Sequence, residues 1–279
     1  SLHPVRSRFP IRFKIRFIRS PWMKKGELEI FLKVKRQDGP DGISYWERFE
    51  FSVPAETTVL SLISKISEEP VTDEGKPSTH VCVESSCGRG LCGSCSMLIN
   101  GRPMLACKTM VSDLDSRITV EPLAKFPVIR DLVTDKSSMC GDLLYHELWS
   151  GCESLPSDDG GSPDFARFEA GRQRLSASFM DCLMCGACVE VCPSVTSRSK
   201  FPGAWLFSVM LGMSLNCSDL SAIKKMRRSA AGPEGLSQCE GVGNCSEFCP
   251  MGLRLSDAMG IAGFEAAVQS LIDFIREES

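Results

Sequence analysis

Two cysteine runs in the second half of the chain have the spacing with the most specific chemistry. The first run has the pattern C-x2-C-x2-C-x3-C-P and consists of Cys182, Cys185, Cys188, Cys192 and Pro193. This spacing is typical of thiolates that bind cubane iron–sulfur clusters, with three cysteines on one cluster and the fourth on its neighbour. The second run keeps the frame in Cys239, Cys245, Cys249 and Pro250. Its middle position is Val242, which has no thiol.

The fourth cysteine of each run predicts an exchange of ligands between two neighbouring sites. We expect a [4Fe–4S] cluster on Cys182, Cys185, Cys188 and Cys249. We expect the second cluster on Cys192, Cys239 and Cys245. Three thiolates favour a [3Fe–4S] cluster, although a cubane whose fourth iron is completed by water or hydroxide stays open. Structural zinc is the other alternative, but zinc sites take four ligands each.

A third cysteine group in the first half has the C-x4-C-x2-C…C spacing of plant-type [2Fe–2S] sites. It consists of Cys87, Cys92, Cys95 and Cys107. Glycines at 88, 90 and 93 allow the unusual dihedrals of a loop wrapped around a cluster. Buried free cysteines are the alternative. The remaining cysteines, Cys82, Cys140, Cys152 and Cys217, fit no ligand frame and are interpreted as structural.

The elements around the third group predict an α+β fold. Apolar and polar residues alternate over 27–36 and 45–53, which predicts a hairpin, and 58–67 has helical spacing. A second hairpin is expected over 96–99 and 103–107 about Asn100-Gly101, and residues 118–122 close the domain. This order predicts a β-grasp plant-type ferredoxin domain over residues 27–124.

Residues 125–279 are predicted to form an all-helical, bacterial-ferredoxin-like domain. Helices are expected over 165–179, 202–216, 220–228 and 256–278. The last is an amphipathic helix with Ser256 as N-cap and apolar Phe264, Val268, Leu271 and Ile275.

The composition sets the class of the protein. With 279 residues, 43% hydrophobic, 24% charged and net charge -3, it is typical of a soluble protein of two domains. Fifteen clustered cysteines indicate metal binding in a reducing compartment. The longest strongly apolar run, 204–213, is shorter than the ~20 residues of a membrane span, so we expect membrane attachment only through partners. Residues 1–26 are basic, which favours the end of a mitochondrial targeting segment, a partner-docking extension or a solvated arm.

The motifs in this order resemble the iron–sulfur subunits of succinate dehydrogenase (respiratory complex II) and fumarate reductase. The matching stretches are SSCGRGLCGSC (85–95), INGRPMLAC (99–107), PVIRDLVTD (127–135), CLMCGACVEVCPS (182–194) and NCSEFCPMGL (244–253). The resemblance implies a relay from FAD on a flavoprotein subunit through [2Fe–2S], [4Fe–4S] and [3Fe–4S] to quinone, beside membrane-anchor subunits. It implies no catalytic residue in this chain. It places the chain in the tricarboxylic acid cycle and respiratory chain, on the matrix side of the mitochondrial inner membrane or the cytoplasmic face of a bacterial one.

The sequence departs from that family at the quinone end. Pro193 and Ser194 match and are the candidate quinone-contacting residues, but Thr196 and Ser197 stand where the family has a tryptophan pair. Glu240 stands where a histidine often follows the first cysteine of the last run. Trp205 is either a substitute or a core residue. The open readings are succinate dehydrogenase, fumarate reductase in reverse, and a structural cluster subunit without quinone chemistry.

Overall fold

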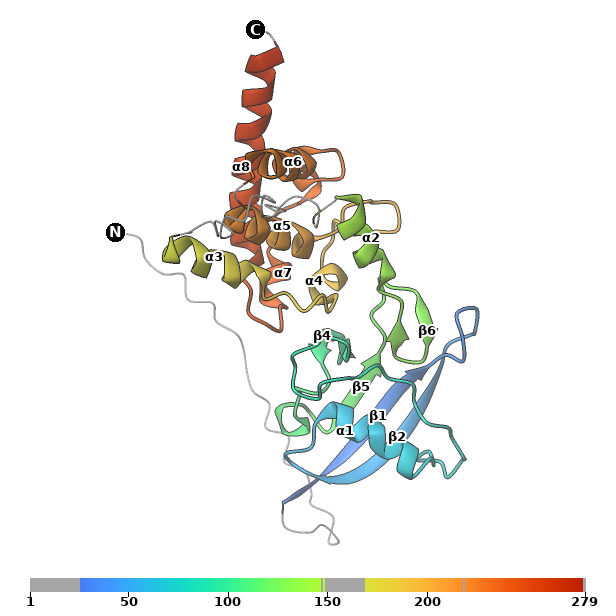
Figure 1. The fold of residues 1–279 in the computed structure, drawn as a ribbon. Helices are drawn as coiled ribbons and strands as arrows, with labels where there is room; N and C mark the ends of the chain where they lie inside the picture. Colours follow the sequence, from blue (N-terminus) through green and yellow to red (C-terminus); the bar gives the residue numbers. More distant parts are fainter. Residues whose placement is uncertain (1–25, 147, 149–168, 218, 278–279) are drawn as a thin grey trace, which may run out of the picture.

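The computed structural model describes residues 26–146, 148, 169–217 and 219–277. The basic N-terminal extension and Cys152 lie outside the described residues. The chain forms an N-terminal sheet region and a C-terminal helical region, which meet where β4 and β6 approach α4 and α2 (Figure 1).

The N-terminal sheet has the strand order β2-β1-β5-β3-β4. Strands β1 (Glu27–Arg36) and β2 (Tyr45–Pro54) form the predicted hairpin, and β5 (Arg117–Glu121) runs parallel to β1. Inward-facing residues of β1 and β5 pack against the predicted helix α1 (Val59–Glu68), which the Thr58 side chain caps by accepting from the Ser61 amide. The buried faces of strand and helix follow the period-2 and helical spacings of the sequence.

The hairpin of β3 (Ser96–Ile99) and β4 (Arg102–Leu105) places two of the predicted ligands together. Its turn is Asn100-Gly101, with φ of 49° and 74°, as a tight two-residue turn requires. Ser96 pairs with Leu105, so Cys95 and Cys107 leave the hairpin at the same end. The predicted hairpin is therefore confirmed, and a 3-10 turn η1 (Val111–Asp113) follows it.

The expectation that residues from 125 onward are entirely helical is wrong for their first stretch. Strands β6 (Val128–Arg130) and β7 (Val133–Thr134) form a two-stranded ribbon. The ribbon is tied to the sheet region, because the Asp131 amide donates to the Gln37 carbonyl and the Leu132 amide to the Cys82 carbonyl. Leu132 packs in the sheet-region core. Hydrogen bonding to residues far away in sequence thus decides the conformation of this stretch.

The helical region is built around α5 (Ala204–Asn216). Nearly every side of α5 is buried, and α3 (Ala170–Met180), α6 (Leu220–Ala231) and α8 (Leu255–Glu277) pack against it. α2 (Ser137–Tyr145) lies at the junction with the sheet region (Figure 1). The short elements α4 (Ala187–Glu190), η2 (Leu236–Gln238) and α7 (Asn244–Glu247) belong to the cysteine runs or precede them. The predicted helices are present, although 165–168 lie outside the described residues.

The terminal helix α8 differs from its prediction in two respects. It begins at Leu255, so Ser256 lies in the first turn, where its amide donates to Ser246 Oγ at 2.7 Å, and is not the N-cap. Its buried residues include three small ones, Ala258, Ala262 and Ala266, together with Leu255, Met259 and Gln269. The apolar residues that we used to predict the helix are exposed: Phe264, Val268, Leu271 and Ile275.

The exposed part of α8 extends beyond the rest of the helical region (Figure 1). Within the described residues, the segment Leu255–Arg276 is long and apolar enough to cross a membrane by length and composition, although core helices of soluble proteins also meet this criterion. Only 28% of its apolar window is buried. The sequence-based prediction of no membrane-spanning segment was made from unbroken apolar runs. It did not include α8, because polar residues interrupt the apolar residues of this helix.

Candidate iron–sulfur sites

The first site is the loop after residue 86 together with the end of the β3–β4 hairpin. Backbone amides point at its thiols: Gly90 N donates to Cys107 Sγ at 3.1 Å, and Arg89 N and Leu91 N donate to Cys87 Sγ at 3.3 and 3.2 Å. Gly88, Gly90 and Gly93 all have positive φ, which only glycine adopts without strain. All four predicted ligands of this site are brought together, with Cys92 beside Cys87 and Cys95 beside Cys107.

The thiols of this loop have contrasting proton affinities. A hydrogen bond from the Ser94 side chain, at 3.1 Å, lowers the pKa of Cys92 to about 6. Amide donors from Arg89 and Leu91 lower the pKa of Cys87 as well. Burial raises the pKa of Cys95 to about 11. The thiolate is the form of cysteine that binds metal. Cys87 and Cys92 therefore lose their protons readily and can bind iron, whereas Cys95 deprotonates only as metal binds.

The second site is a small, mostly apolar cavity at the start of the helical region. Four of its lining residues are the thiols that the ligand exchange predicts for one cluster, Cys182, Cys185, Cys188 and Cys249. Cys249 lies 67 residues after Cys182 in sequence, yet its charge acts on the pKa of Cys182. Apolar residues from α2, α5 and α8 complete the lining.

The third site is a neighbouring small cavity. It is lined by the other three thiols, Cys192, Cys239 and Cys245, with Val242 among them. Pro193 and Ser194 line the same cavity, and Ser194 Oγ accepts from the Glu240 amide at 3.3 Å. The two candidate quinone-contacting residues therefore lie at the three-thiol site.

The two runs repeat one local geometry, which defines the position of Val242. Gly186 precedes α4 with φ of 85°, and Gly243 precedes α7 with φ of 86°. Val242 stands immediately before Gly243 as Cys185 stands before Gly186. The two short helices pack together, and Asn244 Nδ2 donates to the Val191 carbonyl at 3.2 Å. Val242 thus takes the position in the second run that Cys185 takes in the first, and it is 57% exposed.

The start of α5 separates the two cavities. Ala204 lines the three-thiol cavity, and Trp205 lines the four-thiol cavity. The Trp205 ring is completely buried, and its Nε1 donates to the Pro202 carbonyl at 2.9 Å. Of the two readings of this tryptophan, the geometry favours the core residue, because its only donor is already satisfied inside the chain.

The donor chemistry of both cavities fits polynuclear iron. Burial raises the pKa of Cys182 to about 11 and that of Cys188 well above its ordinary value. Buried thiols of this kind become thiolates only when a cationic group binds them. Across the described part of the chain, no three His, Cys, Asp or Glu side chains converge as ligands of a single metal ion. The thiols that line the two cavities are the ligand type that iron–sulfur clusters take.

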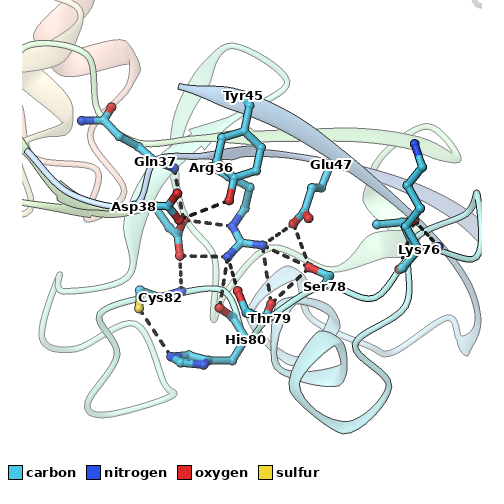
Figure 2. A network of polar contacts seen from close by, with 12 residues as sticks. Arg36, Gln37, Asp38, Tyr45, Glu47, Lys76, Ser78, Thr79, His80 and Cys82 are labelled. Atoms are coloured by element: carbon cyan, nitrogen blue, oxygen red, sulfur yellow. Dashed lines mark hydrogen bonds and ion pairs between the residues drawn. The ribbon is translucent and has the colours of Figure 1, made fainter. Parts of the chain in front are cut away.

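Lys125 was not predicted as a site residue, yet it connects the segment after β5 to the first cysteine run through two hydrogen bonds. Its Nζ donates to the Cys192 carbonyl, and its amide donates to Glu190 Oε2 at 3.0 Å. No motif singles out this lysine. Two of the histidines are distant from these contacts: His80 lies near Arg36 (Figure 2), and His146 is buried beside Ser229. Thr196 Oγ1 accepts hydrogen bonds from the nearby amides of Arg198 and Ser199.

The chain has relatives in both of its halves. Residues 31–141 match the model of a 2Fe-2S iron-sulfur cluster binding domain, and residues 178–253 match that of a 4Fe-4S dicluster domain. It is 32% identical to a "Succinate dehydrogenase iron-sulfur subunit" of Bacillus subtilis, over 86% of this chain and 94% of the relative. It is 30% identical to a "Fumarate reductase iron-sulfur subunit" of Haemophilus influenzae, over 68% and 77%. A chain in a structure titled "Mycobacterium smegmatis Sdh1 complex in the apo form" matches with a TM-score of 0.70 and 26% identity, over 87% of this chain and 97% of that one.

Proposed function

Because the chain belongs to the family of succinate dehydrogenase and fumarate reductase iron–sulfur subunits, we propose that it conducts electrons from a flavoprotein subunit to quinone. It is an iron–sulfur electron-transfer subunit of an oxidoreductase complex. The single observation that supports the relay is the division of the seven thiols of the helical region between two adjacent cavities, four in one and three in the other.

The ligand sets proceed from this division. Cys87, Cys92, Cys95 and Cys107 would hold [2Fe–2S], in a sheet region whose strand order is compatible with a β-grasp ferredoxin domain over 27–124. Cys182, Cys185, Cys188 and Cys249 would hold [4Fe–4S]. Cys192, Cys239 and Cys245 would hold [3Fe–4S], with Val242 at the corner that lacks iron. Such clusters accept and release one electron at a time, and the charge and hydrogen bonds around them set their potentials.

The acceptor end lies at the three-thiol cavity. Pro193 and Ser194 line it and are our candidates for contact with quinone. The Ser194 hydroxyl already accepts from the Glu240 amide, so its own proton is directed elsewhere and can be donated. With Trp205 buried, a further donor to quinone would come from an anchor subunit.

The proposed partners are a flavoprotein subunit that carries FAD and membrane-anchor subunits. The exposed apolar residues of α8 support an anchor contact, because exposed apolar patches of this kind mark interaction sites. The proposed location is peripheral, on the matrix side of the mitochondrial inner membrane or on the cytoplasmic face of a bacterial one. By oxidising succinate and reducing quinone, the proposed complex would take part in the tricarboxylic acid cycle and in the respiratory chain.

Fumarate reduction through the same relay is the second candidate function, since relatives of both names match the chain. The purified complex, assayed with succinate and a quinone and then with fumarate and a quinol, tests both. Succinate-dependent quinone reduction supports the main proposal, and a faster reverse reaction favours the second. A complex that carries all three clusters but transfers electrons in neither direction would support a purely structural subunit and contradict the proposal.

A further inference from the structure

Two glycines lie where the sheet region and the helical region pack against each other. A Cβ atom on Gly93 would lie 2.7 Å from the Leu183 carbonyl oxygen and 3.0 Å from Cys185 Cβ. Neither of these atoms is the end of a flexible side chain, so neither can rotate away. The φ of Gly93 is +76°, a second requirement for glycine. The close approach of the two backbones therefore depends on the missing side chain.

Gly186 makes the corresponding contact from the helical region. A Cβ atom there would lie 2.8 Å from Phe126 Cε2 and 3.2 Å from Leu123 Cδ1, and its φ is +85°. Leu123 and Phe126 lie between β5 and the ribbon, in the segment that connects the two regions. The absence of a side chain at Gly186 thus allows the loop of Cys185 to pack directly against the connecting segment.

The contact between Gly93 and Cys185 joins the loops of two different thiol sets. Gly93 follows Cys92 directly and lies two residues before Cys95, while Cys185 is itself a thiol of the four-thiol cavity. Leu183, Cys185 and Ala187 pack with Cys95 in the core of the sheet region. The loops that carry the two thiol sets therefore approach each other directly at Gly93, where a side chain would clash with Leu183 and Cys185.

We propose that Gly93 and Gly186 are positioning residues that fix the separation between the [2Fe–2S] thiols and the [4Fe–4S] thiols. The proposal rests on the proposed function, because it concerns two cluster sites of the same relay. Electron tunnelling slows exponentially with distance, so the closeness of these two loops limits how quickly the relay conducts. In a close-packed interior, an added methyl group at either glycine forces the loops apart.

The test uses the assembled complex and electron paramagnetic resonance (EPR). In the fully reduced complex, the spin of the four-iron site accelerates the spin relaxation of the two-iron site, and this dipolar effect decreases steeply with distance. We expect Gly93→Ala to lose part of this acceleration while keeping a full [2Fe–2S] spin count. Gly75→Ala is the matched control: Gly75 also has a positive φ, of +75°, but it lies outside the cysteine loops, and a Cβ atom added there would meet no atom of the described residues within 4 Å beyond its chain neighbours. It should keep the parental relaxation.

Gly186→Ala provides a second test that does not alter the [2Fe–2S] loop. It should also weaken the relaxation effect, and adding Phe126→Leu, which removes the clashing ring atoms, should restore much of it. If Gly93→Ala fails to assemble while Gly75→Ala assembles, the comparison of Gly186→Ala with Gly186→Ala/Phe126→Leu decides. Parental relaxation in both Gly93→Ala and Gly186→Ala would overturn the proposal. Absence of the [2Fe–2S] and [4Fe–4S] signals in the parent complex would instead overturn the proposed function.

Discussion

Arg36 and Asp131 form an ion pair with no solvent exposure on either side chain, with 2.9 Å between Arg36 Nε and Asp131 Oδ1. The same carboxylate accepts from the Gln37 amide at 3.2 Å and from the Cys82 amide at 2.9 Å. Figure 2 shows the Arg36 guanidinium surrounded by Glu47, Ser78 and Thr79. Burial opposes the charge of Arg36, but Asp131 and Glu47 outweigh it and raise its pKa. This network fastens the ribbon and the segment that leads to Cys87 onto β1.

Asp131→Ala should therefore destabilise the sheet region by roughly 3 kcal/mol, because Arg36 keeps Glu47 but loses its fully buried partner, and the Gln37 and Cys82 amides lose their acceptor. Thermal unfolding followed by circular dichroism measures this loss, and iron analysis should show reduced [2Fe–2S] content. Glu74→Ala is the control: it breaks an ion pair with Lys76 whose side chains are both mostly exposed, and it should change little. Equal effects of the two substitutions would contradict a structural role for the buried pair.

Cys249→Ser should remove the [4Fe–4S] signal and leave the [3Fe–4S] signal, although Cys249 lies in the second run. The reason is that Cys249 lines the cavity of Cys182, Cys185 and Cys188. Cys245→Ser, four residues earlier, should have the opposite effect, because Cys245 lines the other cavity. EPR spectra of the oxidised and reduced variants measure both. A Cys249→Ser variant that lacks only the [3Fe–4S] signal would refute the exchange of ligands between the runs.

Val242→Cys should convert the three-iron site into [4Fe–4S] and lower its potential, since a fourth thiolate would occupy the place that Cys185 has in the first run. The oxidised-state [3Fe–4S] signal should disappear, and quinone reduction should slow. Val242→Ala, which adds no ligand, should keep the signal. A Val242→Cys variant with the full oxidised-state signal would mean that Val242 is not at the vacant corner.

Asp142→Asn should stabilise the protein at neutral pH but not in acid. Burial, and then the charge of Glu234, raise the pKa of Asp142 to about 6 from 3.8. Between these values the unfolded chain ionises before the folded one, so stability falls as pH rises, and the whole cost is present above about pH 6. Because the side chain is partly exposed, we expect a gain of about 1 kcal/mol.

The melting temperatures of Asp142→Asn and the parent, compared from about pH 4 to pH 8, check this prediction. Asp135→Ala is a control of opposite sign: amide donation from Ser137 lowers the pKa of Asp135, so its loss should destabilise near neutral pH and matter less in acid. A constant difference between Asp142→Asn and the parent across the pH range would exclude ionisation of Asp142 as the cause.

The sequence predicted those features that depend on local spacing. These features include the alternating strand over 27–36 and the Asn100-Gly101 turn. The spacing of cysteines within each run is likewise a property of neighbouring residues. The cysteine spacing also predicted that Cys249 joins Cys182, but contacts between distant residues that no motif encodes were not predictable in this way. Arg36 continues the inward-facing alternation of β1, which was a signal that it is buried, but its partner Asp131 lies 95 residues away.

The exposed face of α8 is a second feature that the spacing of residues along the chain did not predict. Helical spacing of Phe264, Val268 and Leu271 correctly predicted a helix, but it could not predict which face packs. Ala258 and Ala266 are buried where α8 packs on α5 and α6, whereas Phe264, Val268 and Leu271 face outward. Periodicity indicates that a helix has an apolar face, whereas the neighbours decide whether that face is buried within this chain.

The most direct measurement of the central claim is the EPR spectrum of the purified complex, oxidised and then fully reduced, together with its iron and zinc content. We predict a [3Fe–4S] signal in the oxidised state, [2Fe–2S] and [4Fe–4S] signals after reduction, and iron equal to the sum of a two-iron, a four-iron and a three-iron cluster per chain. Stoichiometric zinc in place of iron, or an oxidised state without the [3Fe–4S] signal, would contradict the account.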